Sequence, residues 1–240
     1  MLRIQSKMSC PKVLVGCPTF GGKNYCLKEY ADRVKSLSYN HYDVLLVDNS
    51  KKDGYCENIK DFGLDCVRDE FVPGVKKRLA RSRNVLRKKV LDGGYDYFLS
   101  LEQDVIPPVD VIERLLACNK PVVSAVYTRF ITVVKGDEII TREQIPVLYG
   151  ATPENKTALL PMQAIQGKGV IRIYAGGLGC LLIPRFVLEK IMFHIDDPAK
   201  GCDDFYFFTD LQANKIPAFA HTEVLCAHRE QKWSAEVKKS

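Results

Sequence analysis

The chain has 240 residues, of which 46% are hydrophobic and 27% are charged, and its formal net charge is +6 at pH 7. This length suits one large α/β domain, and the lack of an 18-residue apolar run or a leader-like start predicts a cytoplasmic protein that does not span a membrane. Nine cysteines without a CxxC pair argue against a metal cluster or a disulfide framework. We expect reduced, mostly buried thiols; an isolated disulfide, such as one between Cys56 and Cys66, is left open.

The first hundred residues alternate between short apolar runs and helical patterns. In chain order we expect strand 13–18, helix 23–37, strand 42–48, a weak strand 64–67, helix 76–89 and strand 97–101. Such alternation predicts a mostly parallel sheet with right-handed crossovers. Ligands of such sheets bind at the carboxyl ends of the strands, so the residues that follow each strand are the first candidates for a site.

The helix expected at 76–89 carries much of the basic excess of the chain. A basic helix surface suits a diphosphate, an anionic membrane surface or a nucleic acid. The helix has no interleaved aromatic residues that would stack on bases, so we do not expect nucleic-acid binding. A solvated face that only keeps the protein soluble is the alternative.

Polar residues follow three of the expected strands: Pro18-Thr19-Phe20, Asp48-Asn49-Ser50 and Glu102-Gln103-Asp104. Glu102 and Asp104 are two residues apart, so on an extended chain their side chains share one face. Carboxylate oxygens there suit Mg²⁺ or Mn²⁺ bridged to a diphosphate, whereas a solvated strand end is the alternative. No GxGxxG or Walker-type motif occurs, and by that test Gly21-Gly22-Lys23 is only a flexible turn.

The second half of the chain has a different character. We expect strand 122–127, a β-hairpin over 130–148, a surface loop over 151–166, strand 170–174, a glycine-rich segment 175–179, strand 180–183 and a helix to about 192. Closely spaced glycines indicate close backbone approach, by a ligand or by another strand, or a structural bend. The sequence leaves these readings open.

Taken in order, these motifs resemble the nucleotide-sugar glycosyltransferases of the GT-A fold, especially family 2 and its viral, phage and archaeal relatives. The motifs that carry the resemblance are Pro18-Thr19, Leu46 to Ser50, Arg81-Ser82-Arg83-Asn84, Glu102-Gln103-Asp104, Ala175 to Cys180, Asp203 to Phe207, and a closing strand that leads to His228. They span most of the chain. None is specific alone; the strength lies in their order.

The resemblance implies an α/β fold of the GT-A type, in which helices flank a Rossmann-like, mostly parallel central sheet with a small antiparallel acceptor-side portion. It implies one domain over 1–240, with a nucleotide-sugar-binding half at 1–106 and an acceptor-binding, catalytic half at 107–240. Residues 130–169 are the least motif-like region, where we expect acceptor selectivity or a closing lid.

The resemblance also implies roles for individual residues. Donor-nucleotide binding is assigned to Pro18, Thr19, Asp48, Asn49, Arg81 and Arg83, with Asp48 accepting a hydrogen bond from a ring N–H of the base and the arginines facing the phosphates. Metal binding is assigned to Asp104, Glu102 and His228, acceptor or sugar binding to Gly176, Gly177 and Leu178, and catalysis to Asp204 with Asp203 beside it. Glu102 replaces the usual aspartate, which leaves its direct metal contact open, and Asp203 replaces the usual glutamate.

The activity implied is metal-dependent transfer of a sugar from a nucleoside diphosphate donor, UDP- or GDP-sugar, to a hydroxyl acceptor, with Mn²⁺ or Mg²⁺ as cofactor. Asp204 as general base implies inversion, although the fold also hosts retaining enzymes. The competing hypotheses are a nucleotidyltransferase on a similar sheet and a basic module for nucleic acid or a membrane surface; peripheral membrane contact is compatible with the transferase too. Gln231-Lys232-Trp233 faintly resembles the motif of processive synthases but lacks its arginine, so we do not expect processivity.

Overall fold

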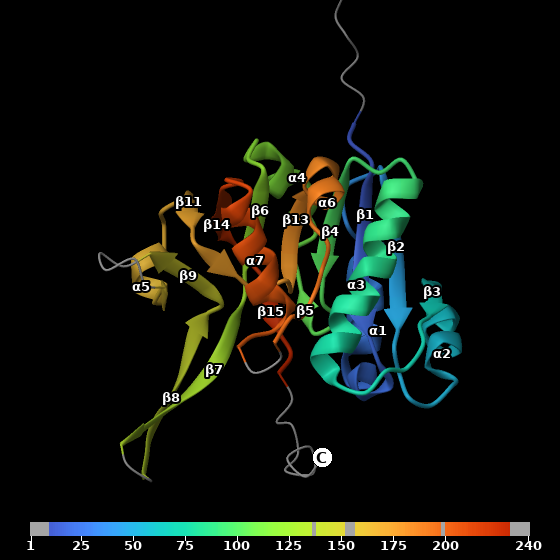
Figure 1. The fold of residues 1–240 in the computed structure, drawn as a ribbon, viewed down its shortest axis with the longest axis horizontal. Helices are drawn as coiled ribbons and strands as arrows, with labels where there is room; N and C mark the ends of the chain where they lie inside the picture. The colour runs from blue at the N-terminus through green and yellow to red at the C-terminus, as the bar shows by residue number, and fades with distance from the viewer. Residues whose placement is uncertain (1–9, 136–137, 152–156, 198–199, 231–240) are drawn as a thin grey trace, which may run out of the picture.

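The computed structural model describes residues 10–135, 138–151, 157–197 and 200–230. An eight-stranded sheet forms its centre, with the strand order β11-β14-β6-β13-β4-β1-β2-β3 (Figure 1). The strands of the first half are β1 (Val13–Thr19), β2 (Tyr42–Asp48), β3 (Asp65–Arg68) and β4 (Tyr97–Leu101). β1 pairs in parallel with β2 and β4, and β2 with β3, which confirms the predicted alternation.

The second half completes the same sheet with β6 (Val122–Val126), β11 (Val170–Ile173), β13 (Cys180–Pro184) and β14 (Ala218–Leu225). β13 lies antiparallel between β4 and β6. β14 is parallel to β6 and β11 is antiparallel to β14. The sheet is therefore mostly parallel, as predicted, and β13 joins the two halves of the chain.

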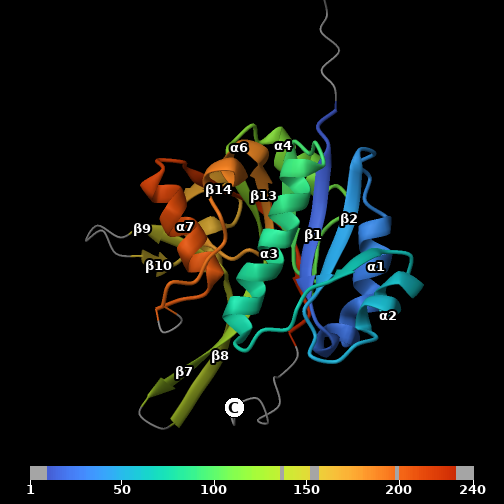
Figure 2. The same cartoon turned by 45° about the vertical axis from the view of Figure 1, so that its right-hand side comes forward.

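Helices cover both faces of the sheet (Figure 2). One face carries α1 (Leu27–Lys35), α2 (Tyr55–Asp61) and α4 (Val111–Ala117), and the other carries α3 (Val75–Asp92), α6 (Arg185–Lys190) and α7 (Asp203–Ala213). Successive residues of a strand point to opposite faces. Leu14 is therefore buried in the cluster that contains Leu86 of α3, whereas Val15 is buried in the cluster that contains Tyr30 of α1.

Three smaller sheets surround this core. β7 (Thr128–Lys135) and β8 (Glu138–Pro146) form the predicted hairpin, which extends away from the body (Figure 1); its expected turn at 136–137 lies outside the described residues. β9 (Leu148–Ala151) pairs with β10 (Thr157–Leu159) and β12 (Ala175–Gly176). β5 (Val105–Ile106) pairs with β15 (Ala227–His228), so the closing strand lies beside the strand end at 102–104.

Three expectations need correction. The segment 151–166 is not a plain loop, because β10 and α5 (Met162–Ile165) lie in it, while 152–156 are outside the described residues. The helix expected from residue 23 begins as a 3₁₀ helix, η1 (Gly21–Cys26), before α1. The helix expected to reach 192 ends at Lys190. The segment 231–233 is outside the described part of the chain.

All nine cysteines are free of disulfide bonds in the structure, and six of them are buried. No helix in the described part of the chain combines the length and apolar character needed to cross a lipid bilayer.

Candidate functional site

The carboxyl ends of β1 and β4 are joined through Gln103, the middle residue of the acidic triplet. Its side chain is fully buried. The amide oxygen accepts a hydrogen bond from Thr19 Oγ1, the amide lies within hydrogen-bond distance of Tyr55 Oη, and Nε2 donates to the Lys23 carbonyl at 2.7 Å. Gln103 therefore anchors the triplet inward, while the two acids beside it meet the same cation.

That cation is Lys23, which the sequence analysis treated as part of a flexible turn. Lys23 Nζ lies 2.7 Å from Asp104 Oδ1 and 3.7 Å from Glu102 Oε2, and its side chain is 15% exposed. Burial lowers the pKa of Lys23, but the charges of Glu102 and Asp104 outweigh burial and raise it above that of an ordinary lysine. The Lys23 side chain therefore keeps its positive charge beside these two carboxylates.

Asp104 also faces His228, its predicted partner from the far end of the chain. His228 Nε2 lies 3.8 Å from Asp104 Oδ2, and Nδ1 lies 2.7 Å from the Thr128 carbonyl oxygen. A carbonyl only accepts hydrogen bonds, so Nδ1 carries the proton and Nε2 is left toward Asp104. Burial raises the pKa of Asp104, but His228 and Lys23 outweigh it and lower this pKa to about 2.

The pKa of His228 is raised. Burial lowers this pKa, but Asp104, the Thr128 carbonyl and Glu230 together raise it by more than burial lowers it.

In the described part of the chain, no three His, Cys, Asp or Glu side chains gather closely enough to enclose a metal ion. Asp104 Oδ2 and His228 Nε2 fit a more open site, because atoms bound at about 2.1 Å to one ion can lie 3.8 Å apart. Two protein ligands leave the remaining positions to water or a diphosphate.

Arg83 connects the other two acidic positions. Its guanidinium is 1% exposed, donates to Glu102 Oε1 at 2.6 Å and forms an ion pair with Asp203. Burial lowers the pKa of Arg83, but Asp203 and Glu102 raise it overall. Its Nε has no hydrogen-bond partner and is buried. A buried N–H without a partner costs free energy, so this atom is suited to a ligand oxygen.

Asp204 follows Asp203 in the first turn of α7, where the helix dipole favours negative charge. Its Oδ1 accepts a hydrogen bond from the Phe205 backbone N–H at 2.7 Å. Burial, with the charge of Asp203 as the next cause, raises the pKa of Asp204 above that of an ordinary aspartate. A carboxylate with a raised pKa is a stronger base than a solvated one.

Part of this cluster lines a pocket of about 240 Å³, whose wall does not include Gln103, Lys23 or Asp104. The predicted site residues in its wall are Arg83, Glu102, Leu178, Asp203, Asp204 and His228. The other residues of the wall were not predicted from the sequence; they are Leu79, Tyr127, Arg129, Val147, Cys202 and Glu230. The structure thus brings together predicted residues from β4, α3, α7, the glycine-rich segment and the closing strand.

The carboxylate of Asp48, which was predicted to bind the donor base, is already bound by other residues of the chain. It is fully buried, accepts hydrogen bonds from Ser50 N at 2.9 Å and Ser50 Oγ at 2.5 Å, and pairs with Arg68 Nη1 at 2.8 Å. Arg68 is 32% exposed and covers the carboxylate. A nucleotide base would therefore reach Asp48 only after Arg68 moved. Arg68 was not among the predicted residues; its place at the carboxyl end of β3 is the signal that marks it.

The remaining predicted donor residues lie outside the pocket wall. Pro18 and Thr19 end β1, and Thr19 is buried against Gln103. Asn49 is buried and donates to Ser82 Oγ at 3.1 Å. Arg81 is half-exposed and pairs with Asp69 at 2.9 Å and Glu70 at 3.2 Å.

The glycine-rich segment makes room for a tyrosine. A Cβ atom on Gly177 would overlap Tyr127 Oη, and one on Gly179 would lie 2.7 Å from Tyr127 Cζ. The Gly179 N–H donates to Tyr127 Oη at 3.2 Å. The Tyr127 ring meets the His228 ring edge-on at 5.4 Å. The sequence had left open a ligand, another strand or a bend. At Gly176 the segment pairs with strand β9, whereas at Gly177 and Gly179 the close approach is by a side chain, which was not among those alternatives.

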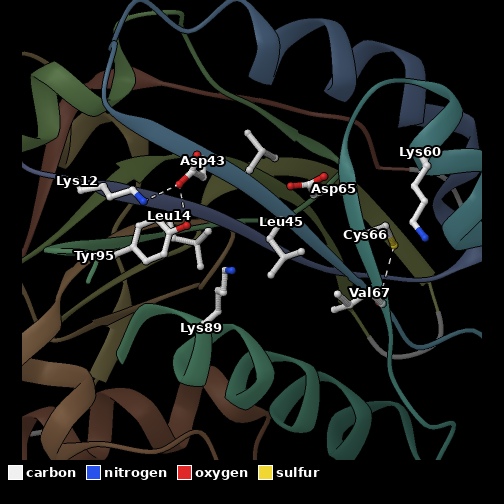
Figure 3. Close-up of a pocket in the computed structure, with 11 residues that line it drawn as sticks. Lys12, Leu14, Asp43, Leu45, Lys60, Asp65, Cys66, Val67, Lys89 and Tyr95 are labelled. Carbon is white, nitrogen blue, oxygen red and sulfur yellow. Dashed lines mark hydrogen bonds and ion pairs between the residues drawn. The ribbon is translucent and has the colours of Figure 1, made fainter. Parts of the chain in front are cut away.

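A larger pocket, of about 620 Å³, lies elsewhere (Figure 3). Its wall includes Lys12, Leu14, Asp43, Asp65 and Lys89, and none of the predicted site residues. Lys12 pairs with Asp43 at 3.0 Å, and Leu14 and Asp43 stand near the amino ends of β1 and β2. Because ligands of parallel sheets bind at the carboxyl ends, the smaller pocket is the better candidate.

No protein-family model matches the sequence, and no curated protein sequence matches it. Solved structures do match. The mannosyltransferase PcManGT from Pyrobaculum calidifontis, in complex with GDP-Man and Mn²⁺, has a TM-score of 0.61 at 15% identity over 96% of this chain. GalNAc-T7 with UDP, GalNAc and Mn²⁺ has a TM-score of 0.67 at 14% identity over 93% of this chain. A197 from STIV has a TM-score of 0.49 at 16% identity, with 92% of this chain and 86% of that chain covered.

This chain spans 60% of the length of PcManGT and 44% of that of GalNAc-T7. At these identities the likeness shows the fold. The described architecture, with its mostly parallel central sheet, flanking helices and small antiparallel sheets, is the GT-A fold, which confirms the fold expected from the order of the motifs.

Proposed function

We propose that this chain, which has the GT-A fold, is a metal-assisted glycosyltransferase that moves a sugar from a nucleoside diphosphate, UDP- or GDP-sugar, to a hydroxyl acceptor. The observation that carries the proposal is the pocket at the carboxyl ends of the strands, where Arg83, Glu102, Asp203, Asp204 and His228 meet. The structures of PcManGT and GalNAc-T7, two of those that match the fold, contain Mn²⁺ and a nucleotide.

On the donor side, the proposal depends on positive charges, a metal ion and Arg83, that would stabilise the leaving diphosphate. Departure of a nucleoside diphosphate develops negative charge on its phosphate oxygens. Bound Mn²⁺ or Mg²⁺ would offset that charge. Asp104 Oδ2 and His228 Nε2 would hold the ion, and an imidazole ligand favours Mn²⁺ over Mg²⁺. Arg83, in the wall of the pocket, adds a second positive charge.

The acceptor side rests on Asp204. A hydroxyl that attacks the sugar must lose its proton, and Asp204 lines the pocket with a raised pKa caused by burial and by Asp203. Direct attack assisted by this base inverts the anomeric centre. NMR of the new linkage checks this step, and a product with the configuration of the donor would contradict it.

The proposal treats the chain as one domain, with a donor half at 1–106 and an acceptor half at 107–240, because β13 of the second half is inserted beside β4 of the first.

The contacts of the arginines of α3 argue against the alternative of a basic binding module. Arg83 is held by Glu102 and Asp203, Arg81 by Asp69 and Glu70, and Arg87 donates to the carbonyls of α6 and the segment after it, so much of the basic charge of α3 serves contacts within the chain.

The test is thermal unfolding with UDP, GDP, dTDP, CDP and ATP, each with and without Mn²⁺. A ligand at about a hundred times its Kd adds roughly 2.7 kcal/mol, which raises Tm by several degrees in a chain of this size. We expect one diphosphate to raise Tm only with Mn²⁺ in the wild type and not in Asp104→Ala. Asp32→Ala, which removes an exposed acid of α1, is the matched control and keeps the shift.

A chain that responds to none of these nucleotides would contradict the proposal. A preference for triphosphates, with release of pyrophosphate from a sugar phosphate and a nucleotide, would instead favour the nucleotidyltransferase. Binding of anionic vesicles or nucleic acid that survives Asp104→Ala and falls steeply with salt would favour the basic module.

A further inference from the structure

Lys23 occupies the acidic strand end from within the chain. Its ammonium lies 2.7 Å from Asp104 Oδ1 and 3.7 Å from Glu102 Oε2, and the side chain is 15% exposed. The carboxylates that the resemblance assigns to a divalent metal are therefore already shared with a buried monovalent cation.

The position of Lys23 is held by its backbone. The Lys23 carbonyl accepts hydrogen bonds from Gln103 Nε2 at 2.7 Å and from Cys26 Sγ at 3.2 Å, and the Lys23 N–H donates to the Phe20 carbonyl at 2.9 Å. Gln103 lies between the two acids in sequence, so the same residue fixes the lysine and the carboxylates. Hydrogen bonds thus hold the Lys23 backbone in η1 in place, whereas the positive charge lies at the end of its long, flexible side chain.

Both carboxylates of this strand end already have cationic partners within the chain. Glu102 pairs with Arg83 as well as with Lys23, and Asp104 pairs with Lys23 and faces His228. A divalent ion that binds Asp104 adds two positive charges beside a buried ammonium, and like charges that close repel. A diphosphate supplies the negative charge that relieves this repulsion.

We propose that Lys23 is an internal counter-cation that competes with the divalent ion for Asp104, so that the donor-free protein binds metal weakly and metal and nucleoside diphosphate bind cooperatively. When both bind, the Lys23 ammonium turns from Asp104 to the phosphate oxygens. This inference rests on the proposed function, because the diphosphate comes from the donor.

The first experiment measures Mn²⁺ binding to the nucleotide-free protein by the loss of the free Mn²⁺ EPR signal. We expect Lys23→Met to bind Mn²⁺ at least tenfold more tightly than the wild type, and Lys23→Arg, which keeps the charge, to show no gain. Lys28→Met is the matched control, since it removes an exposed lysine of the adjacent helix. The gain must vanish in Lys23→Met/Asp104→Ala. Equal affinity in Lys23→Met and wild type, or a gain that survives loss of Asp104, overturns the proposal.

The second experiment measures coupling. In the wild type, saturating Mn²⁺ tightens binding of the diphosphate identified in the thermal panel, and the factor by which it does so falls at least tenfold in Lys23→Met. An unchanged factor overturns the proposal. If Lys23→Met does not fold, Lys23→Gln replaces it. In the wild type itself, saturating Mg²⁺ shifts the Lys23 Nζ resonance and leaves that of Lys28 unchanged; a Lys23 resonance that does not move contradicts the proposal.

The two proposals fail separately. Metal affinity is measured without nucleotide, so a gain in Lys23→Met stands even if no nucleotide binds. A metal-dependent nucleotide shift in the wild type supports the transferase even if Lys23→Met leaves metal affinity unchanged.

Discussion

Arg83 on α3 and Asp203 on α7 form an ion pair between residues 120 positions apart, and their side chains are 1% and 3% exposed. Two charges buried this completely lose their hydration, so each depends on the other for compensation. Because Arg83 also holds Glu102, this single guanidinium ties the end of β4 to the start of α7 and sets the spacing of the candidate site.

Replacing Arg83 should destabilise the fold strongly. Arg83→Met leaves Asp203 buried without its cation, and removing one partner of a buried pair typically costs about 3–5 kcal/mol. Urea unfolding at pH 7 measures the change. Lys88→Met, which removes an exposed lysine of the same helix, is the control and should leave the unfolding free energy nearly unchanged. Equal effects of the two substitutions would show that the buried pair is not a structural link.

Replacing Asp204 should separate activity from stability. Asp204→Asn removes the proposed general base, so we expect kcat to fall at least about 100-fold. The fold should not weaken at pH 7, because the substitution removes a half-buried charge that Asp203 repels. Steady-state kinetics with the identified donor and thermal unfolding provide the two measurements. Asp210→Asn, further along α7, is the control; a loss of activity there as large as in Asp204→Asn would remove the special role of Asp204.

The raised pKa of Asp204 also has a pH signature. A group whose pKa is higher in the folded chain favours folding at pH values below its unfolded pKa, and this contribution is lost as the pH rises through the folded pKa. The same shift moves the acidic limb of kcat/KM above the ordinary aspartate pKa of about 4. A pH–rate profile measures this limb, and a limb at or below about 4 would argue against Asp204 as the base.

Asp104 should affect the pH dependence of folding stability in the opposite direction to Asp204. Its pKa is lowered from 3.8 to about 2, so it stabilises the fold above its unfolded pKa and loses this contribution as the pH falls from about 4 to about 2. The side chain is 12% exposed, and the shift corresponds to on the order of 2 kcal/mol. Urea unfolding between pH 5 and pH 2 should show a shallower loss of stability in Asp104→Asn than in the wild type. Parallel curves would contradict the assignment.

The glycine-rich segment predicts a double-mutant effect. Gly177→Ala drives a methyl group into Tyr127 Oη, and overpacking of this kind costs about 1–3 kcal/mol. Part of the cost should disappear in Gly177→Ala/Tyr127→Phe, which removes the colliding oxygen. At Gly176 the nearest atom to an added Cβ, the Val147 carbonyl oxygen, is 3.4 Å away, so Gly176→Ala is the milder control. Additive effects of the two changes would exclude this contact as the cause.

Local patterns were sufficient for most of the architecture. The apolar runs at 13–18, 42–48 and 97–101 became neighbouring parallel strands, because alternating strands and helices leave few ways to bury a sheet on both faces. The hairpin over 130–148 was equally readable. The segment 151–166 was not, since β10 there is a short strand whose pairing with β9 depends on a partner, not on its own pattern.

The candidate site was predictable as a set of residues but not as a set of contacts. The position of Glu102 and Asp104 after an apolar strand predicted that they would lie at one edge of the sheet. The resemblance carried by the order of the motifs predicted Arg83, Asp203, Asp204 and His228 as further site residues. The roles of Lys23, Arg68 and Tyr127 were not predicted, because a lone lysine in a 3₁₀ helix, an arginine at a strand end or a tyrosine between two strands has no periodic pattern to mark it.

The sequence by itself determined where strands end in acid, which helix is basic and in what order these features come, because those properties depend on neighbours within a few residues. Only the tertiary structure decided which charge meets which: Lys23 with Asp104, Arg83 with Asp203, and Arg68 with Asp48. Coulomb interactions and desolvation depend on distance in space. Partners that lie 20 to 120 positions apart along the chain are brought within bonding distance only by the folded sheet.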